Sequence, residues 1–141
     1  MEEKKTILVV DDQPPTRRFL RNVLEREGYL VIEAEDEASA WDVVRKQNTP
    51  ISLAMIDVNL PGLKGRQVAN NLRSFGPLPV VLMTGDSAPA LIEEGSLEEG
   101  APLIEKPFTV SAVMGAVDRA LKEQRQRLIN EELRSTILGS D

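Results

Sequence analysis

The chain has 141 residues, which fits one domain by the usual prior of about 100–200 residues per domain. Its net charge of −6 argues against direct nucleic-acid binding, because that needs a basic face to neutralise phosphates. The absence of Cys and His excludes thiol nucleophiles, disulfides, Cys/His zinc sites, Ser-His-Asp triads and imidazole bases.

Short apolar runs alternate with amphipathic stretches, the pattern of β–α units around a parallel sheet. The first helix is predicted to begin near Pro14 and to stop at Gly28, and Asp36 can cap the second. The third is expected in residues 66–72, the fourth is a weak pattern at 88–99, and Thr109 can cap the last. The strands are predicted at residues 7–10, 30–32, 53–56, 80–83 and 103–104. We therefore expect an α/β fold with a doubly wound five-stranded parallel sheet.

No stretch is long enough for a signal peptide or a membrane span. Only residues 7–10 form an apolar run before the first acidic pair, whereas a secretory segment needs about 7–15 apolar residues and a span about 20. We predict a soluble, cytoplasmic protein that makes no membrane contact.

Polar residues follow four of the five predicted strands directly. Asp11 and Asp12 follow the first strand, Asp57 the third, Thr84 the fourth and Lys106 the fifth. In open α/β sheets ligands bind beyond the carboxyl ends of the strands, so these side chains are expected to converge. Three carboxylates favour a divalent cation such as Mg²⁺, and a lysine and a hydroxyl can bind phosphoryl oxygens. The pattern predicts a phosphoryl-transfer site.

Each of these residues alone has an ordinary structural explanation. An aspartate at a strand end is often a turn former or a helix cap, a threonine before glycine is often a turn residue, and a lone lysine is usually a solvated charge. Their joint placement at successive strand ends is what favours function.

Four segments together resemble the receiver domain of two-component response regulators. They are VVDDQ (residues 9–13), MIDVNLPG (55–62), MTG (83–85) and IEKPF (104–108). The resemblance covers roughly residues 5–122. It implies a flavodoxin-like (βα)5 fold with strand order 2-1-3-4-5. It also implies a domain that is no enzyme in the usual sense, because it catalyses only its own phosphorylation and dephosphorylation.

The resemblance assigns a role to each acidic residue. Asp57 corresponds to the aspartate that accepts a phosphoryl group from a histidine kinase or a histidine phosphotransfer protein. Asp12 corresponds to the direct Mg²⁺ ligand and Asp11 to the residue that assists through water. The backbone carbonyl of Asn59 and the carboxylate of Asp57 complete the expected metal ligands.

The resemblance also assigns the phosphoryl-binding residues, with one departure. Thr84 would hydrogen-bond the phosphoryl group, and Lys106 would pair with it. The Lys106–Pro107 peptide bond is expected to be cis. The family usually has Tyr or Phe three residues before the lysine as a switch, whereas this chain has Leu103. The usual coupling to an output is therefore in question.

Residues 123–141 follow the predicted receiver, residues 1–122, as a helical extension or linker. Apolar residues recur there at helical spacing, which fits a long last helix or a break followed by a short one. A frayed tail is the plain alternative, and a homodimer through a coiled-coil-like seam is the sharper one. The abrupt end of the pattern favours a piece of a longer protein over a stand-alone receiver.

Two other functions compete with the phosphoacceptor hypothesis. A pseudo-receiver would bind partners without phosphorylation, which the intact acidic set disfavours. A Mg²⁺-dependent phosphohydrolase would show an Asp-x-Asp spacing after the first strand, which Asp11, Asp12 and Gln13 do not provide.

Overall fold

A computed structural model describes residues 4–46, 50–58, 70, 78–85 and 103–138. Five parallel strands pair in the order β2-β1-β3-β4-β5, which confirms the predicted sheet. The helices predicted at 66–72 and 88–99 lie, except for position 70, outside the described residues. The elements are β1 (Thr6–Val10), α1 (Pro14–Arg26), β2 (Leu30–Ala34), α2 (Glu37–Lys46), β3 (Ile51–Asp57), β4 (Val80–Thr84), β5 (Leu103–Glu105) and α5 (Val110–Leu138).

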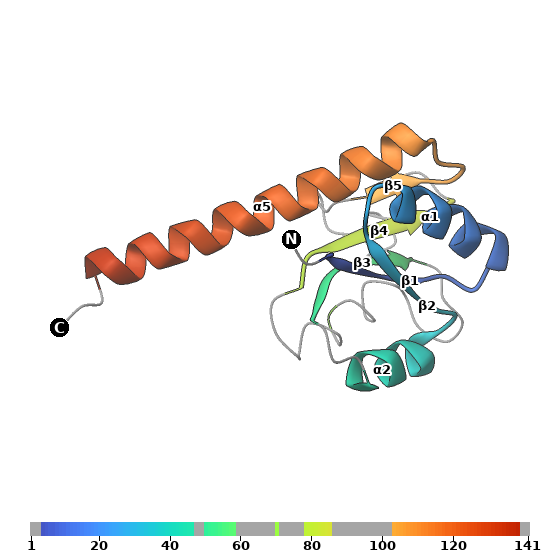
Figure 1. Ribbon diagram of the computed structural model, residues 1–141, viewed down its shortest axis with the longest axis horizontal. Helices are drawn as coiled ribbons and strands as arrows, with labels where there is room; N and C mark the ends of the chain where they lie inside the picture. The colour runs from blue at the N-terminus through green and yellow to red at the C-terminus, as the bar shows by residue number, and fades with distance from the viewer. Residues whose placement is uncertain (1–3, 47–49, 59–69, 71–77, 86–102, 139–141) are drawn as a thin grey trace, which may run out of the picture.

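The sheet is covered on both faces, with α1 and α5 on one side and α2 on the other (Figure 1). Successive residues of β1 alternate between the two apolar cores. Ile7 and Val9 pack on the α1 and α5 side, and Leu8 and Val10 pack on the α2 side. Because every β1 residue is buried, its sequence is an unbroken apolar run after Thr6. Burial of each such side chain stabilises the fold by about 1.5–3 kcal/mol.

The helix boundaries follow from local chemistry. Gly28 adopts a φ of 92° directly after α1, a conformation that glycine tolerates and other residues rarely adopt. The backbone N–H of Ser39 donates to Asp36 Oδ1 at 2.8 Å, which caps α2. The N–H of Ala112 donates to Thr109 Oγ1 at 3.0 Å, which caps α5. All three predicted boundary residues are confirmed.

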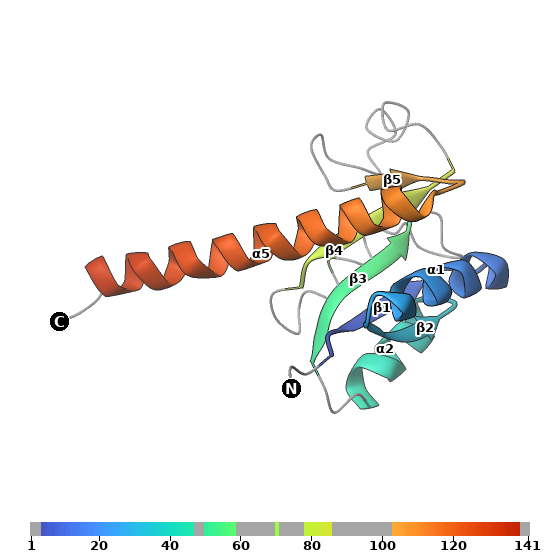
Figure 2. The ribbon, with the colours of Figure 1, turned by 45° about the horizontal axis from the view of Figure 1, so that its top comes forward.

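Helix α5 continues well past the sheet as one unbroken helix (Figure 2). Val113, Val117 and Ala120 are buried against the sheet, whereas every described side chain after Gln124 is exposed. Of the two arrangements predicted for the chain's end, the long helix is therefore correct. Among the described residues, no helix is both long and apolar enough to cross a membrane.

Candidate functional site

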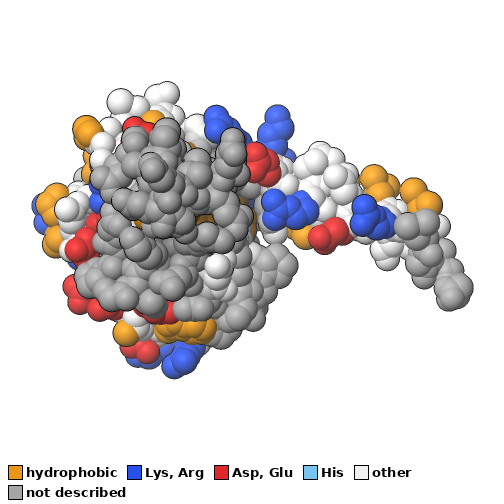
Figure 3. All heavy atoms as spheres, turned by 180° about the vertical axis from the view of Figure 1, so that it is seen from behind, with side chains coloured by type: hydrophobic (Ala, Val, Ile, Leu, Met, Phe, Trp, Pro, Cys, Tyr) orange, Lys and Arg blue, Asp and Glu red, His pale blue; other side chains and the backbone are white. Residues whose placement is uncertain are grey.

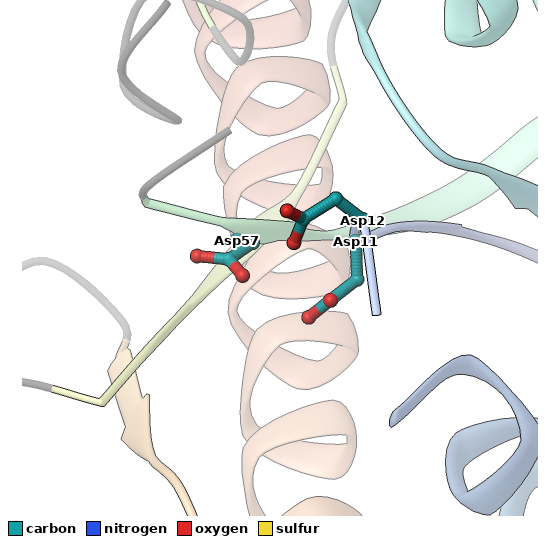
Figure 4. A group of neighbouring side chains, drawn as sticks. All are labelled: Asp11, Asp12 and Asp57. Atoms are coloured by element: carbon teal, nitrogen blue, oxygen red, sulfur yellow. The ribbon is translucent and has the colours of Figure 1, made fainter. Parts of the chain in front are cut away.

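Three carboxylates meet at the carboxyl ends of the two central strands. Val10 pairs with Ile56 in the sheet, so the residues that follow them, Asp11 and Asp57, lie side by side at one edge. Asp12 is next along the chain, and one oxygen from each of the three aspartates lies within 4.8 Å of the others. Figure 4 shows the side chains converging from the ends of β1 and β3.

The three aspartates differ in their exposure to water. Asp11 is fully buried and Asp57 is 5 % exposed, whereas Asp12 is exposed. The backbone N–H of Gln13 donates to Asp11 Oδ1 at 2.8 Å. Burial raises the pKa of Asp11, and the charge of Asp57 adds to the rise, although Lys106 and the Gln13 N–H oppose it. The folded chain therefore disfavours the charge of Asp11 even with the Lys106 ammonium beside it.

Lys106 supplies one positive charge to this cluster. Its Nζ donates to Asp57 Oδ2 at 2.9 Å and lies 2.8 Å from Asp11 Oδ2 as an ion pair. Nζ also donates to Gln13 Oε1 at 3.3 Å. Burial lowers the pKa of Lys106, but the hydrogen bonds and charges of Asp11 and Asp57 outweigh it, so the pKa is raised. The Lys106–Pro107 peptide bond is cis.

The donor set fits a hard divalent cation. Three carboxylates and one ammonium carry a formal net charge of about −2, concentrated where one oxygen from each aspartate lies within 4.8 Å of the others. Oxygen ligands from one or two carboxylates, completed by water and phosphoryl oxygens, are the environment that Mg²⁺ prefers. Asp12, being exposed, is the carboxylate that a hydrated ion can reach most directly.

Of the remaining predicted residues, Thr84 lies at the same edge of the sheet, whereas Leu103 stands at the start of β5. Thr84 is fully buried at the end of β4, and its carbonyl accepts the backbone N–H of Lys106 at 2.6 Å. Leu103 is half-buried and packs against the α2-side core. Asn59 lies outside the described residues. Sequence reasoning missed Arg17, which donates to the backbone carbonyl of Asp11, and Glu33, which accepts from Arg17.

Comparisons with known proteins point to one family. The family described as response regulator receiver domain matches residues 7–118. The chain is 33 % identical to response regulator GtcR of Aneurinibacillus migulanus, over 96 % of this chain and 57 % of GtcR. It is 31 % identical to response regulator receiver protein CpdR of Brucella abortus, over 83 % of this chain and 97 % of CpdR. The chain thus spans nearly all of one relative and little more than half of the other.

A solved structure supports the same fold. It is the N-terminal domain of a response regulator/sensory box/GGDEF three-domain protein from Carboxydothermus hydrogenoformans. The two share 26 % identity and superpose with a TM-score of 0.76, over 88 % of this chain and 99 % of that one.

Proposed function

This chain belongs to the response regulator receiver family, and we propose that it accepts a phosphoryl group on Asp57 from a phosphohistidine partner. The observation that carries the proposal is the position of Asp57. It lies at the end of a central strand, bonded to Lys106 and within 4.8 Å of two further carboxylates. Such an arrangement combines a nucleophile with groups that balance phosphoryl charge.

The transfer is a displacement at phosphorus. A carboxylate oxygen of Asp57 forms a bond to the phosphorus, the bond from phosphorus to the histidine nitrogen breaks, and the nitrogen leaves with the electron pair. The departing imidazolate nitrogen then takes a proton from water, which gives a neutral imidazole and hydroxide. Lys106, which holds Asp57 Oδ2 at 2.9 Å before transfer, can pair with a phosphoryl oxygen afterwards.

Bound Mg²⁺ would neutralise phosphoryl oxygens and so stabilise the charge in the transition state. Asp12 would hold the ion directly, with Asp11 acting through water and Asp57 and the Asn59 carbonyl completing the set. The proposal draws support from the hard oxygen donors of the three aspartates and from their charge, which Lys106 compensates only in part. The buried Asp11 is positioned by Gln13 and Lys106, while Asp12 is exposed to the incoming hydrated ion.

We further propose that the signal leaves the site through the junction of β4 and β5. Thr84 would hydrogen-bond the new phosphoryl group. Its backbone carbonyl already accepts the Lys106 N–H at 2.6 Å, so movement of Thr84 is coupled to β5. Leu103 has no ring or hydroxyl to swing, so this backbone link would replace the usual aromatic switch.

Labelling with a small phosphodonor tests the phosphoacceptor role. The whole chain, incubated with Mg²⁺ and acetyl phosphate, is expected to gain one phosphoryl mass, and Asp57→Asn is expected to lose it. Asp42→Asn, an exposed carboxylate on α2, is the matched control and should label normally. Full labelling of Asp57→Asn would contradict the assignment.

A pseudo-receiver that binds partners without phosphorylation is the alternative. This alternative predicts no labelling of the unmodified chain at saturating Mg²⁺. It also predicts that a captured partner binds Asp57→Asn as well as the unmodified protein.

The phosphodonor is proposed to be a histidine kinase or a histidine phosphotransfer protein that docks beside the site. A hollow there is lined in part by Phe19 and Phe108, whose ring centroids lie 6.4 Å apart. Pro15, exposed at the start of α1, also lines the hollow. Pro15→Glu is expected to slow transfer from a phosphohistidine protein while leaving labelling by acetyl phosphate unchanged. Equal slowing of both reactions would argue against docking at this surface.

The part of α5 beyond the receiver, within residues 123–141, is proposed to pair with a second copy of the chain. Figure 3 shows hydrophobic side chains near its free end, and Ile129, Leu133 and Ile137 are 42 %, 54 % and 75 % exposed. Their spacing of four residues departs from the average of 3.5 in a coiled coil, so two such helices should cross as ridges in grooves.

Oligomeric state at several protein concentrations tests the pairing. Light scattering is expected to show a concentration-dependent dimer, and Leu133→Gln with Ile137→Gln is expected to shift it to monomer. A monomer at every concentration would contradict the pairing.

Three expectations stay predictions from the sequence. They are activity limited to the chain's own phosphorylation and dephosphorylation, a receiver spanning residues 1–122, and a cytoplasmic location.

A further inference from the structure

Arg17 on α1 ties the end of β1 to β2. Its Nη1 donates to the backbone carbonyl oxygen of Asp11, and its Nε donates to Glu33 Oε1 at 3.2 Å. The Arg17 side chain is 16 % exposed, so the contact lies largely within the protein. Its carbonyl partner belongs to the peptide group that joins Asp11 to Asp12. A hydrogen bond to that oxygen therefore orients the peptide plane from which Asp12 continues.

Glu33 is held in place from a second direction. Its Oε2 accepts from Arg21 Nε at 2.7 Å, and Arg21 Nη1 donates in turn to Glu25 Oε1 at 2.7 Å. The hydrogen bond to Glu33 is the main cause of a raised Arg21 pKa. Both carboxylate oxygens of Glu33 are thus used, one by each arginine. Since partnered charge-assisted bonds fix side-chain orientation, Arg17 is held in one position.

We propose that Arg17 is a positioning residue for the cation site, and that Glu33 acts by holding Arg17 in place. The inference rests on the proposed function, because it concerns the same aspartates. Three bonds fix the turn after β1: Gln13 N–H to Asp11 Oδ1, Asp11 N–H to the Ala34 carbonyl, and Arg17 to the Asp11 carbonyl. The first two reach Asp11, and the bond from Arg17 sets the peptide leading to Asp12. Asp12 is exposed, so its carboxylate depends on its backbone for placement.

The direction in which Arg17→Ala changes Mg²⁺ affinity separates positioning from simple electrostatics, whereas Glu33→Gln weakens binding in either case. Arg17 is a cation near an acidic cluster. If it acted only through its charge, Arg17→Ala would strengthen Mg²⁺ binding and Glu33→Gln would weaken it. If it positions the turn, both substitutions weaken binding, and Arg17→Ala does so against the electrostatic effect. Partners that orient metal ligands typically change affinity by about 10–100-fold when they are removed.

Calorimetric titration of the whole chain with Mg²⁺ tests the inference. Arg17→Ala and Glu33→Gln are expected to raise the Kd for Mg²⁺ by about 10-fold, at the low end for such partners. Arg18→Ala removes the same charge from the neighbouring exposed position and is expected to leave the Kd within about twofold. Arg17→Met keeps most of the side-chain length but removes the charge and the hydrogen bond to the Asp11 carbonyl, so it serves if Arg17→Ala fails to fold: charge alone predicts tighter Mg²⁺ binding, and positioning predicts weaker binding.

Labelling by acetyl phosphate gives a second readout. At saturating Mg²⁺ both variants are expected to label at the rate of the unmodified chain, because only occupancy of the site has changed. An unchanged or lower Kd in Arg17→Ala would overturn the positioning role while leaving Asp57 as the acceptor. Absence of Mg²⁺ binding by the unmodified chain would overturn the proposed function, and the positioning role with it.

Discussion

Replacing Asp12 by Asn should stabilise the cation-free protein and remove its response to Mg²⁺. Asp12 contributes one of three carboxylate oxygens that lie within 4.8 Å of one another. Lys106 contacts Asp11 and Asp57, whereas Asp12 is exposed to water. Its charge therefore adds repulsion that the lysine offsets only in part. The amide of Asn keeps nearly the same shape, so the substitution tests charge alone.

The size of the change in stability follows from the distance between the carboxylate oxygens. Two unit charges 4.8 Å apart repel by about 0.9 kcal/mol in bulk water and about 3.5 kcal/mol at an effective dielectric constant of about 20. Because Asp12 is exposed, we use the repulsion energy in water for its interaction with each of the other two carboxylates. The attraction of Lys106 offsets part of the summed repulsion. We expect Asp12→Asn to raise the free energy of unfolding by about 1 kcal/mol without cation.

Urea denaturation in EDTA and in Mg²⁺ measures both parts of the prediction. A gain of about 1 kcal/mol moves the urea midpoint upward by about 0.3–1 M for a small domain. The unmodified chain should gain about 2.7 kcal/mol at a free Mg²⁺ concentration 100 times its Kd. The variant should gain almost none, so the order of stability reverses between the two buffers.

Asp42→Asn on α2 is the control, because its carboxylate is exposed outside the cluster. It should change the midpoint little in EDTA and keep the full response to Mg²⁺. If Asp12→Asn were no more stable than the unmodified chain in EDTA, the repulsion argument would be wrong. If it kept the full Mg²⁺ response, Asp12 would not be the direct ligand.

Three further predictions concern charge and backbone conformation. The pKa of Lys106 is higher in the folded chain than its unfolded value of about 10.4, so the lysine stabilises the fold fully below that pH and loses this effect as pH rises through the folded pKa. Lys106→Met should therefore lower the urea midpoint at pH 7. In strong alkali the variant and the unmodified chain should have the same midpoint. Gly28→Ala should lower the free energy of unfolding by about 1–2 kcal/mol, because Gly28 has a positive φ. Gly115→Ala, at an exposed position within α5, should raise it by up to about 1 kcal/mol. The midpoints of thermal unfolding of the two variants should therefore shift in opposite directions. The hydrogen bonds of Ser39 lower the pKa of Asp36, so Asp36→Ala should cost about 1 kcal/mol at neutral pH, with the difference fading in acid as pH falls through that lowered value.

Much of this fold could be read from local sequence patterns. The strand at residues 7–10 is apolar throughout because both of its faces are covered, and Gly28, Asp36 and Thr109 mark helix ends by chemistry confined to a few residues. The strand order was expected through the resemblance to a family rather than from the patterns. The start of β3 at Ile51 rather than Leu53 was missed, since half-buried residues at a strand's start carry a weak pattern.

The sequence by itself determined which residues stand at strand ends, because alternation between strand and helix is a local property of the chain. Only the tertiary structure decided which of them touch. Lys106 and Asp57 are 49 residues apart along the chain, yet their side chains meet at 2.9 Å. Glu33 in β2 was a charged residue without a predicted role, and its two arginine partners come from a different element. Such contacts depend on how strands and helices pack across the whole domain, and the local periodicity of apolar residues does not predict that packing.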